Sequence, residues 1–375
     1  MEPRQVLFIA EGQMGDLLLL TPALRSLKAS YPSASISVLV LERHPPRDDS
    51  PVNFDNPIAS DTERRTSVLS THPAVSELYV LNRNALRERK GSARVRAEWS
   101  IIKFLRSRHF DTVICTFPED RFTLWAFASG ARNRIGQKQQ GFAFLLSVAP
   151  DIRKDQQGVL QYYCDLVRET GATIVSHRTE FTIPDESRDW CDTYLRSVDL
   201  SPMQRLVAVH PGASGDYKIW PPERYAALID YIQETLGARV LLLKGAQDAP
   251  VVTVLKEAAT SAPVEVDTGG NIGHLAALMS SCALCVSNDS GPRHLAVALG
   301  VPSLAIFRQH HDREWKIYPD RPDCVVLKSD LSCPACPEGI CLDKKPDGVR
   351  FGSYCTRMVS VEDVMARVRQ LLKAS

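Results

Sequence analysis

The sequence predicts an α/β protein with two doubly wound halves that face each other across a cleft. Patterns typical of short buried strands alternate with amphipathic helical patterns along most of the chain, as in parallel sheets covered by helices. This alternation restarts after a polar connector at residues 172–187. The 375 residues also suffice for two domains with separate cores. Ligands of such sheets bind at the carboxyl ends of the strands, where we expect the functional residues.

The first half begins with a strand, a glycine-containing turn, a helix and a second strand, which is the order of a parallel βαβ unit. Val6–Ala10 and Ile36–Leu41 are rich in β-forming residues, and the leucines from Leu17 to Leu27 recur at helical spacing. Further strands are expected at 78–81 and 111–115, with helices at 94–106 and 119–128. The proline-rich stretch 42–73 has little periodicity, which indicates a long loop that is either functional or disordered.

The second half repeats the alternation and ends in a helix. Strands are expected at 206–210, 239–243, 283–287 and 302–307, and helices at 187–197, 222–236, 250–259, 272–280 and 291–299. The final pattern at 361–374 has one apolar face, and Ser360, three residues before Asp363, suits a capping box at its start. We therefore expect an N-terminal domain over 1–180, a C-terminal domain over 187–358 and a closing helix over 360–375.

The composition is that of a globular protein, with 44% hydrophobic and 24% charged residues. The net charge of +1 gives no indication of a nucleic-acid partner. No stretch approaches the ~20 apolar residues of a membrane span, and the apolar run at the N-terminus is too short for a signal peptide. We expect a cytoplasmic protein that would touch a membrane only from its cytoplasmic side.

One segment has a strong local charge. Residues 83–108 hold nine Lys and Arg against two acidic residues, a local charge of +7. Such a run is commonly a solvated helix face. It is equally consistent with a surface for anionic lipid headgroups or a phosphorylated acceptor, and the sequence leaves both interpretations open.

The first strand is followed by EGQMGD, in which the glycines allow a tight turn. Asp16 then falls at the start of the next helix, where an acidic residue stabilises the helix dipole. The same position would also suit a general base that removes a proton from a hydroxyl group.

Two further strand ends carry polar residues. The strand at 206–210 leads into the loop PGASGDYK, which is either a flexible loop with a surface lysine or an anion site that presents backbone N–H groups and Lys218 to phosphates. Asp248 follows the strand at 239–243, where it would accept hydrogen bonds from a ribose or cap the next helix.

The stretch NDSGPRHLAVALG follows the strand at 283–287. Gly291 begins a helix whose first N–H groups favour a pyrophosphate. Asp289 beside an anion is expected to orient the loop or to accept hydrogen bonds from a sugar. His294 lies one turn into the helix, where packing over the helix is its ordinary role.

These stretches, in this order, resemble glycosyltransferase family 9, the ADP-heptose:lipopolysaccharide heptosyltransferases. The matching segments are GQMGDLLLLTPALRSL, PGASGDYKIWPPERY, LAALMSSCALCVS and NDSGPRHLAVALG. Each motif alone is weak, but their ordered combination is specific and spans most of the chain. The resemblance implies a GT-B fold with two Rossmann-like domains, the first binding the acceptor and the second binding the nucleotide sugar.

The resemblance also implies a reaction. It predicts inverting, metal-independent transfer of heptose from ADP-heptose to an anionic, lipid-linked inner-core lipopolysaccharide acceptor, with peripheral contact at the inner membrane. By matching positions, Asp16 would be the catalytic base and Lys218 would stabilise the departing diphosphate. The implied donor-site residues are Gly15, Ser214, Lys218, Asp248, Asp289, Ser290, Gly291 and His294. Lys244 departs from the family pattern, in which glycine is frequent at this position.

Four of the ten cysteines crowd into the spacing C-x2-C-x4-C-x13-C, comprising Cys333, Cys336, Cys341 and Cys355. The first pair has metal-ligand spacing, which predicts a structural Zn or Fe site or, alternatively, a set of reduced thiols. Cys-bearing tails also occur in some relatives, including iron-binding autotransporter heptosyltransferases. The six scattered cysteines are expected to be reduced and buried.

Two other functions remain open. A heptosyltransferase with a protein acceptor would carry the same donor motifs, and a nucleotide-sugar-binding protein without catalysis would carry part of them. The presence of both Asp16 and Lys218 argues against the second. A Rossmann dehydrogenase is disfavoured because no G-x-G-x-x-G follows the first strand.

Overall fold

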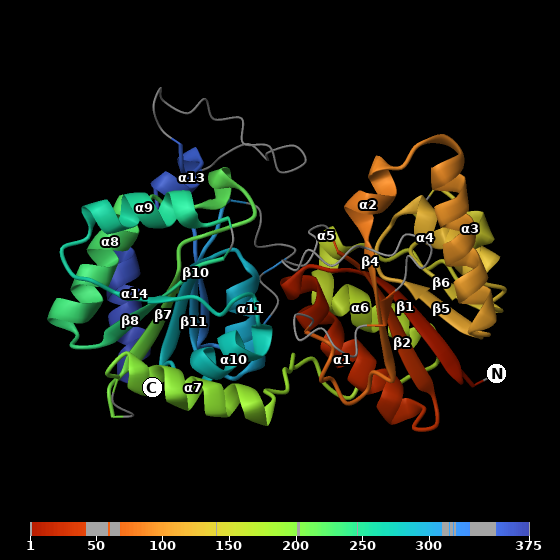
Figure 1. Cartoon of the computed structure of the whole chain (residues 1–375), viewed down its shortest axis with the longest axis horizontal. Helices are drawn as coiled ribbons and strands as arrows, with labels where there is room; N and C mark the ends of the chain where they lie inside the picture. The colour runs from red at the N-terminus through yellow and green to blue at the C-terminus, as the bar shows by residue number, and fades with distance from the viewer. Residues whose placement is uncertain are drawn as a thin grey trace. The chain divides into compact units, whose positions relative to one another are not determined.

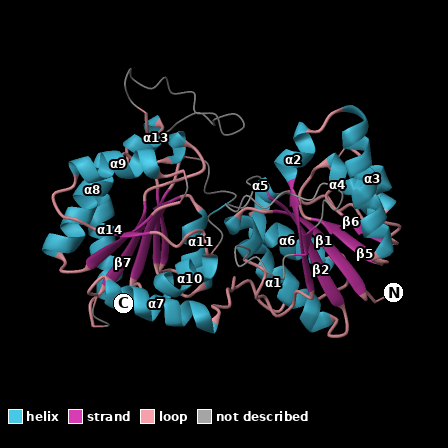
Figure 2. Cartoon of the chain, in the orientation of Figure 1, coloured by secondary structure: helices cyan, strands magenta, loops and turns pink. Residues whose placement is uncertain are grey.

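The chain forms two compact units, Met1–Thr182 and Ile183–Ser375, each built on one sheet (Figure 1). The computed structural model describes residues 2–42, 68–139, 141–200, 203–245, 247–309, 320–330 and 350–374, residues 315 and 318, and the backbone of 59–60. Helices cover the sheets of both units (Figure 2). Most of the loop predicted at 42–73 lies outside the described residues, as do Cys333, Cys336 and Cys341.

The sheet of unit 1 has the strand order β3-β4-β2-β1-β5-β6. Its strands are β1 (Gln5–Glu11), β2 (Ser35–Glu42), β3 (Ala59–Ser60), β4 (Glu77–Asn82), β5 (Thr112–Cys115) and β6 (Asn133–Ile135). Its helices are α1 (Met14–Ser30), α2 (Arg83–Glu88), α3 (Gly91–Ser107), α4 (Asp120–Ala128), α5 (Lys154–Gln157) and α6 (Val159–Arg168), with a 3₁₀ turn η1 (Ala143–Leu145). All strand pairs are parallel except β3 with β4.

Burial explains why β1 and β2 consist almost entirely of apolar residues. Both strands lie inside the sheet and are buried along nearly their whole length, as parallel strands with two covered faces must be. The chain moves from β1 to β2 in one direction and returns to β5 on the other side of β1. The carboxyl end of β1 is therefore the switch point of the sheet, where ligands bind in such folds.

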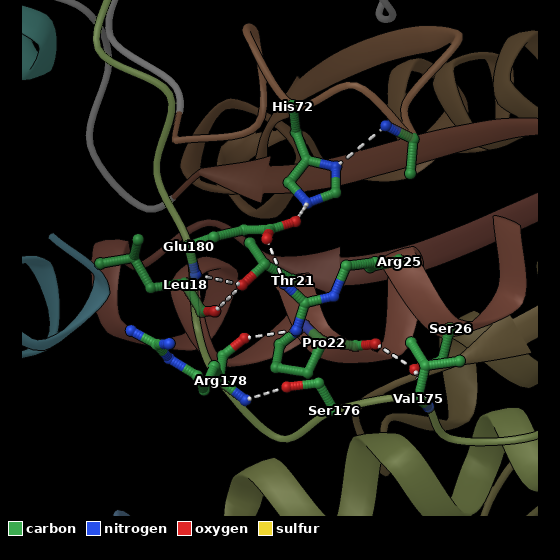
Figure 3. A network of polar contacts seen from close by, with 11 residues as sticks. Leu18, Thr21, Pro22, Arg25, Ser26, His72, Val175, Ser176, Arg178 and Glu180 are labelled. Atoms are coloured by element: carbon green, nitrogen blue, oxygen red, sulfur yellow. Dashed lines mark hydrogen bonds and ion pairs between the residues drawn. The ribbon is translucent and has the colours of Figure 1, made fainter. Parts of the chain in front are cut away.

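The segment that closes unit 1, residues 171–182, has no helix or strand and is held against α1 by side chains (Figure 3). Arg25 forms an ion pair with Glu180, and Thr21 Oγ1 accepts a hydrogen bond from the Glu180 amide at 3.1 Å. His72 Nε2 lies 3.1 Å from the same carboxylate. The connector is thus fixed to the first unit up to the unit boundary.

The sheet of unit 2 has the order β12-β11-β10-β7-β8-β9, with every pair parallel. Its strands are β7 (Leu206–His210), β8 (Arg239–Leu243), β9 (Val264–Val266), β10 (Leu284–Asn288), β11 (Ser303–Ile306) and β12 (Cys324–Leu327). Its helical segments are α7 (Asp185–Ser197), η2 (Asp216–Lys218), α8 (Pro222–Asp230), η3 (Tyr231–Thr235), α9 (Ala249–Ala258), α10 (Ile272–Ser280), α11 (Gly291–Ala298), α13 (Tyr354–Arg357) and α14 (Val361–Ala374). The switch point lies between β7 and β10.

The last helix confirms its predicted start. Ser360 Oγ accepts a hydrogen bond from the Asp363 amide at 3.1 Å and donates to the Asp363 carboxylate at 2.6 Å. Val364 and Val368 of α14 pack into the core of unit 2 beside Trp220 and other buried residues. The helix predicted over 222–236 differs in detail, because its last turn, η3, is π-helical.

Every strand and helix predicted from the sequence is present, with ends shifted by a few residues. The sequence interpretation missed α6, the short helices α2, α5 and α13, and the short strands β3, β6, β9 and β12. Within the described ranges, no helix is both long and apolar enough to cross a membrane.

Candidate active site

Asp16 lies in the first turn of α1, immediately after the switch point of unit 1. The turn that places it there requires a glycine at position 12. The Gly12 amide donates to the Leu41 carbonyl at 2.9 Å, and a Cβ on Gly12 would lie 2.9 Å from that oxygen. Gly15 is buried and Asp16 is half-buried. The carboxylate therefore sits at the strand edge where the sequence predicted a functional group.

Tyr163 of α6 is a partner of Asp16 that the sequence interpretation missed. Its hydroxyl donates to Asp16 Oδ1 across 3.4 Å. Burial raises the pKa of Tyr163, and the nearby negative charge of Asp16 raises it further. The phenol therefore stays protonated and acts as a hydrogen-bond donor to the carboxylate.

Arg83 crosses the same edge of the sheet in a buried position. It donates to Glu11 at the end of β1 at 2.5 Å and to Glu119 before α4 at 2.9 Å. Both Glu11 and Arg83 are buried. The first cation of the basic segment 83–108 thus holds the strand edge together and is not a surface charge.

Asn288, at the end of β10, organises the switch point of unit 2. Its Nδ2 donates to the carbonyls of Pro211 at 2.7 Å and Gly212 at 3.1 Å. Its Oδ1 accepts from the Trp220 amide at 2.9 Å and the Tyr225 hydroxyl at 3.0 Å. The side chain is completely buried and has four partners, so it fixes the loop after β7 and the segment before α8 to β10.

A second buried polar group, the His210 side chain at the end of β7, connects the loops that follow β8 and β10. His210 Nε2 lies 3.1 Å from Asp248 Oδ2, and Nδ1 lies 3.2 Å from Ser290 Oγ. Burial tends to raise the pKa of Asp248, but the hydrogen bond and charge of His210 and the Gly245 amide together lower it. Asp248 lies so close to Gly212 that a Cβ there would approach its Oδ1 to 2.0 Å. Glycine is therefore required in the loop.

Lys218 brings a positive charge to this edge of the sheet. Its ammonium lies 3.4 Å from Asp289 Oδ2, and both side chains are largely buried. Asp289 directly precedes Ser290, the N-cap residue of α11. The arrangement places an ammonium group close to the positive end of a helix dipole, with Asp289 positioned to orient it.

His294 packs in the interior, the ordinary role considered for it from the sequence. Its Nδ1 hydrogen-bonds the Tyr318 hydroxyl at 2.6 Å, and the side chain is almost completely buried. Burial lowers its pKa to about 3, with a further contribution from Arg293. The ring is therefore neutral near pH 7.

Arg293 was not singled out from the sequence, although it is also buried. Its guanidinium lies over the rings of Phe307 and Tyr318, with its Cζ 4.9 and 5.2 Å from the ring centroids. Nη1 donates to the Trp315 carbonyl at 2.9 Å. The Arg293 cation lies in the first turn of α11 and is stabilised by these two aromatic rings.

The other predicted residues divide into two groups. Ser290 and Gly291 begin α11 beside Asp289, as expected, whereas Ser214 is exposed in the loop after β7. Lys244 forms an ion pair with Glu265 at 3.1 Å. The lysine that departs from the family pattern is therefore held by an acid of β9.

The sequence profile of glycosyltransferase family 9 (heptosyltransferase) matches residues 98–345. The chain belongs to this family. It is therefore a glycosyltransferase, and the predictions of family and enzyme class are confirmed.

Individual family 9 proteins are similar to this chain over most of their length. Lipopolysaccharide heptosyltransferase 3 of Escherichia coli is 25% identical over 301 residues, covering 78% of this chain and 80% of that protein. The structure of a family 9 glycosyltransferase from Veillonella parvula matches with a TM-score of 0.76 at 21% identity, covering 100% of this chain and 98% of that one. An E. coli heptosyltransferase solved with ADP-2-deoxy-2-fluoro heptose matches with a TM-score of 0.68 at 17% identity, covering 98% and 99%. These structures confirm the predicted fold class.

The cysteines of this family 9 chain are only partly described. Cys355 is buried, and its Sγ lies 3.2 Å from Ser353 Oγ. Of the six scattered cysteines, Cys324 is half-buried and the other five are buried, all as free thiols. No group of three or more His, Cys, Asp and Glu within the described ranges is arranged to hold a metal ion.

Proposed function

We propose that this family 9 glycosyltransferase transfers heptose from ADP-heptose to inner-core lipopolysaccharide, with inversion at the anomeric carbon and no divalent metal. The observation that carries the proposal is the buried polar network of Asn288, which holds the Lys218 segment and the α11 N-terminus at one switch point. The names of the relatives support the donor and acceptor classes, because they include lipopolysaccharide heptosyltransferase 3 and a heptosyltransferase solved with an ADP-sugar analogue.

The donor would bind to unit 2. The Lys218 ammonium and the first N–H groups of α11 supply positive charge for a diphosphate. Asp248 has an ionised carboxylate at the end of β8, which suits acceptance of hydrogen bonds from ribose hydroxyls. Asp289 would orient Lys218, since the two groups already lie 3.4 Å apart. We therefore assign donor binding to the domain at 187–358 and acceptor binding to the domain at 1–180.

The chemistry is a single in-line displacement. Asp16 takes the proton of an acceptor hydroxyl while that oxygen forms a bond to the anomeric carbon of heptose. The bond from this carbon to the diphosphate oxygen breaks, and ADP leaves with the electron pair. Lys218 and the α11 amides stabilise the charge that develops on the leaving oxygen, a role that metal ions fill in many other phosphate reactions.

The direct test is transfer with defined substrates. Wild-type protein is incubated with ADP-, UDP- and GDP-linked sugars and lipopolysaccharide truncated before the first, second or third heptose, in the presence of EDTA. We expect product only from ADP-heptose, with the anomeric configuration of the transferred heptose opposite to that in the donor. A requirement for added metal, retention of configuration or labelling of protein in place of glycan would contradict the corresponding part of the proposal.

The base is tested by Asp16→Asn, which keeps the shape of the side chain. We expect kcat to fall by about 10²- to 10⁴-fold while the affinity for ADP in calorimetry stays unchanged. A variant that retains wild-type turnover would contradict the role of Asp16.

Elemental analysis of the same preparations tests the separate prediction of structural Zn or Fe at Cys333, Cys336, Cys341 and Cys355.

A further inference from the structure

One face of unit 1 exposes apolar side chains that a solvated surface does not need. Nine large hydrophobic residues within the described ranges are exposed, and five of them lie on α3, α4 and η1. They are Val95 (56% exposed), Trp99 (56%), Leu124 (42%), Phe127 (53%) and Phe144 (77%). Single exposed apolar residues are normal, but a group on adjacent elements calls for a partner. We call this surface the α3–α4 face.

The five side chains belong to one side of the sheet. The inner faces of α3 and α4 are buried in the same core cluster, α3 through Ile101 and α4 through Phe122. The two helices lie next to each other in unit 1 (Figure 1), and α4 also contacts η1. By helical geometry Trp99 lies nearly opposite Ile101, and Leu124 nearly opposite Phe122, so both point away from the sheet on the same side.

The charge on this surface is mostly positive, and its exposed acid on α4, Asp120, accepts a hydrogen bond from the Gly141 amide at 2.8 Å. The exposed cations of α3 are Arg94, Arg96, Lys103 and Arg106, and none of them forms an ion pair with another described residue. The acid of this helix, Glu98, points toward α4, where it accepts from Trp125 Nε1 at 2.8 Å and pairs with Arg121 at 3.4 Å. The structure thus directs the negative charge of α3 inward and its positive charges outward.

A hollow on α3 combines both kinds of side chain. It is lined by Arg89, Arg96, Lys103, Trp99, Ala93 and Ser100. Two of the lining cations, Arg96 and Lys103, are exposed, and no acidic residue takes part. Cations beside an indole ring and small side chains suit a phosphate headgroup with its glycerol backbone.

We propose that the α3–α4 face docks on the surface of an anionic phospholipid bilayer. Trp99, Phe127 and Phe144 would enter the boundary between headgroups and acyl chains, and the α3 cations would meet lipid phosphates, as in helices that lie in the membrane interface. A solvated helix face would account for the charges but not for the apolar group. Trp, Phe and Arg also occur in protein interfaces, so self-association through this face is one of the measured outcomes. Docking would hold the enzyme where a lipid-linked acceptor lies.

Sedimentation of the full chain with lipid vesicles tests this proposal. Vesicles of phosphatidylethanolamine and phosphatidylglycerol are compared with vesicles of phosphatidylcholine alone, at low and high NaCl. We expect binding to the anionic vesicles that weakens as salt screens the charges. Arg96→Gln and Lys103→Gln should each lower the partition coefficient about fivefold, and the double variant Trp99→Ala, Phe127→Ala should lower it at least about tenfold.

Matched controls come from unit 2. Met203 is 94% exposed and belongs to unit 2, not to the elements of the α3–α4 face, so Met203→Ala should bind vesicles as wild type does. All substituted side chains are exposed, and unchanged thermal unfolding verifies that the variants fold. Equal binding to neutral and anionic vesicles, or full binding by both sets of variants, would overturn the proposal. So would ultracentrifugation showing that Trp99→Ala, Phe127→Ala turns a dimer into a monomer, because the face would then join two copies of the chain.

The proposal and the proposed function fail in different ways. The α3–α4 variants should transfer sugar normally to a delipidated, water-soluble core oligosaccharide and show a raised KM only for acceptor in anionic vesicles. Asp16→Asn should show the reverse, with normal vesicle binding and lost transfer. Vesicle binding by a chain that transfers no heptose would leave the docking surface in place and remove the function.

Discussion

The carboxyl edges of the two sheets are built differently. In unit 2, Asn288 and His210 are buried, and their hydrogen bonds run between loops that are far apart in sequence. In unit 1, Asp16 is only half-buried, and its distance to the Tyr163 hydroxyl is 3.4 Å, longer than a well-formed hydrogen bond between oxygens. The edge that would hold a charged nucleotide is rigid. At the edge of unit 1 the buried Arg83 also holds Glu11 and Glu119, but the contact between Asp16 and Tyr163 is looser.

This difference has a physical reason in the proposed reaction. Binding of a diphosphate gains most when the cation and amides are already fixed, because little reorganisation is then needed. A carboxylate that takes up a proton must stay accessible to the acceptor, and saturating it with strong donors would weaken it as a base. The comparison therefore predicts large stability effects in unit 2 and kinetic effects in unit 1.

Asn288→Ala should produce the largest effect. It leaves the Trp220 amide and the Tyr225 hydroxyl buried without their acceptor, and we expect a loss of about 3–4 kcal/mol in the free energy of unfolding. Urea titration with hydrogen exchange of unit 2 peptides measures it. The control is Asn271→Ala, which removes the acceptor of the Gly273 and His274 amides at the start of α10 and should cost only about 1 kcal/mol. If both variants lose the same free energy of unfolding, the Asn288 network contributes no more to stability than an ordinary helix cap.

Lys218→Met tests the rigid edge through ligand binding. We expect the Kd for ADP to rise about 10- to 100-fold, which is the range for hydrogen bonds to charged groups. Calorimetry measures the change, and the double variant with Asp289→Asn separates loss of the phosphate contact from the cost of removing a cation next to Asp289. If Lys218→Met binds ADP as tightly as wild type, the donor site must lie elsewhere.

His294 gives the rigid edge a pH dependence. Its pKa is about 3 in the folded protein and 6.5 as its ordinary value, so below pH 6.5 the unfolded chain binds a proton that the folded chain does not. The stabilisation is complete above pH 6.5 and is lost as the pH falls toward 3. Between pH 7 and pH 5 the loss should be about 2 kcal/mol.

The measurement is urea unfolding of wild type and His294→Gln at both pH values. Glutamine does not titrate, so the free energy of unfolding of the His294→Gln variant should fall by about 2 kcal/mol less than that of wild type between pH 7 and pH 5. If the two proteins show the same pH dependence, the pKa of His294 in the folded protein is close to its ordinary value, and burial does not lower it.

The sequence predicted the positions of the candidate site residues better than it predicted their hydrogen-bond partners. Glycine and proline mark the strand ends, so Asp16, Lys218 and Asp289 could be assigned to the edges of the sheets. The partners are far away in the chain, since His210 meets Asp248 across 38 positions and Asp16 meets Tyr163 across 147. Local patterns carry no information about such contacts, and only the fold brings them together.

The basic segment shows the same limit from the other side. The sequence gives the total charge of 83–108 but not its direction. In the structure, Arg83 forms ion pairs with Glu11 and Glu119. Arg108 lies beside Glu77 and over the rings of Tyr79 and Phe104. The exposed cations of α3 form the α3–α4 face together with aromatic residues that the charge pattern did not include.

Tyr163→Phe should produce the smallest effect and tests the looser edge. It removes one hydrogen bond to Asp16 while keeping the ring, so we expect kcat to fall by about 2- to 10-fold with the KM for ADP-heptose unchanged. Steady-state kinetics as a function of pH measures both values, and the acid limb of kcat should move to higher pH because the carboxylate has lost a donor that favours its charged form.

The neighbouring residue offers a control for that experiment. Tyr162 is also buried on α6, but its hydroxyl has no hydrogen-bond partner within the described ranges. Tyr162→Phe therefore removes the same atom one position away and should leave kcat and its pH profile unchanged. If both variants lose activity equally, the effect comes from the packing of α6. If neither loses activity, the hydrogen bond from Tyr163 contributes nothing to the role of Asp16.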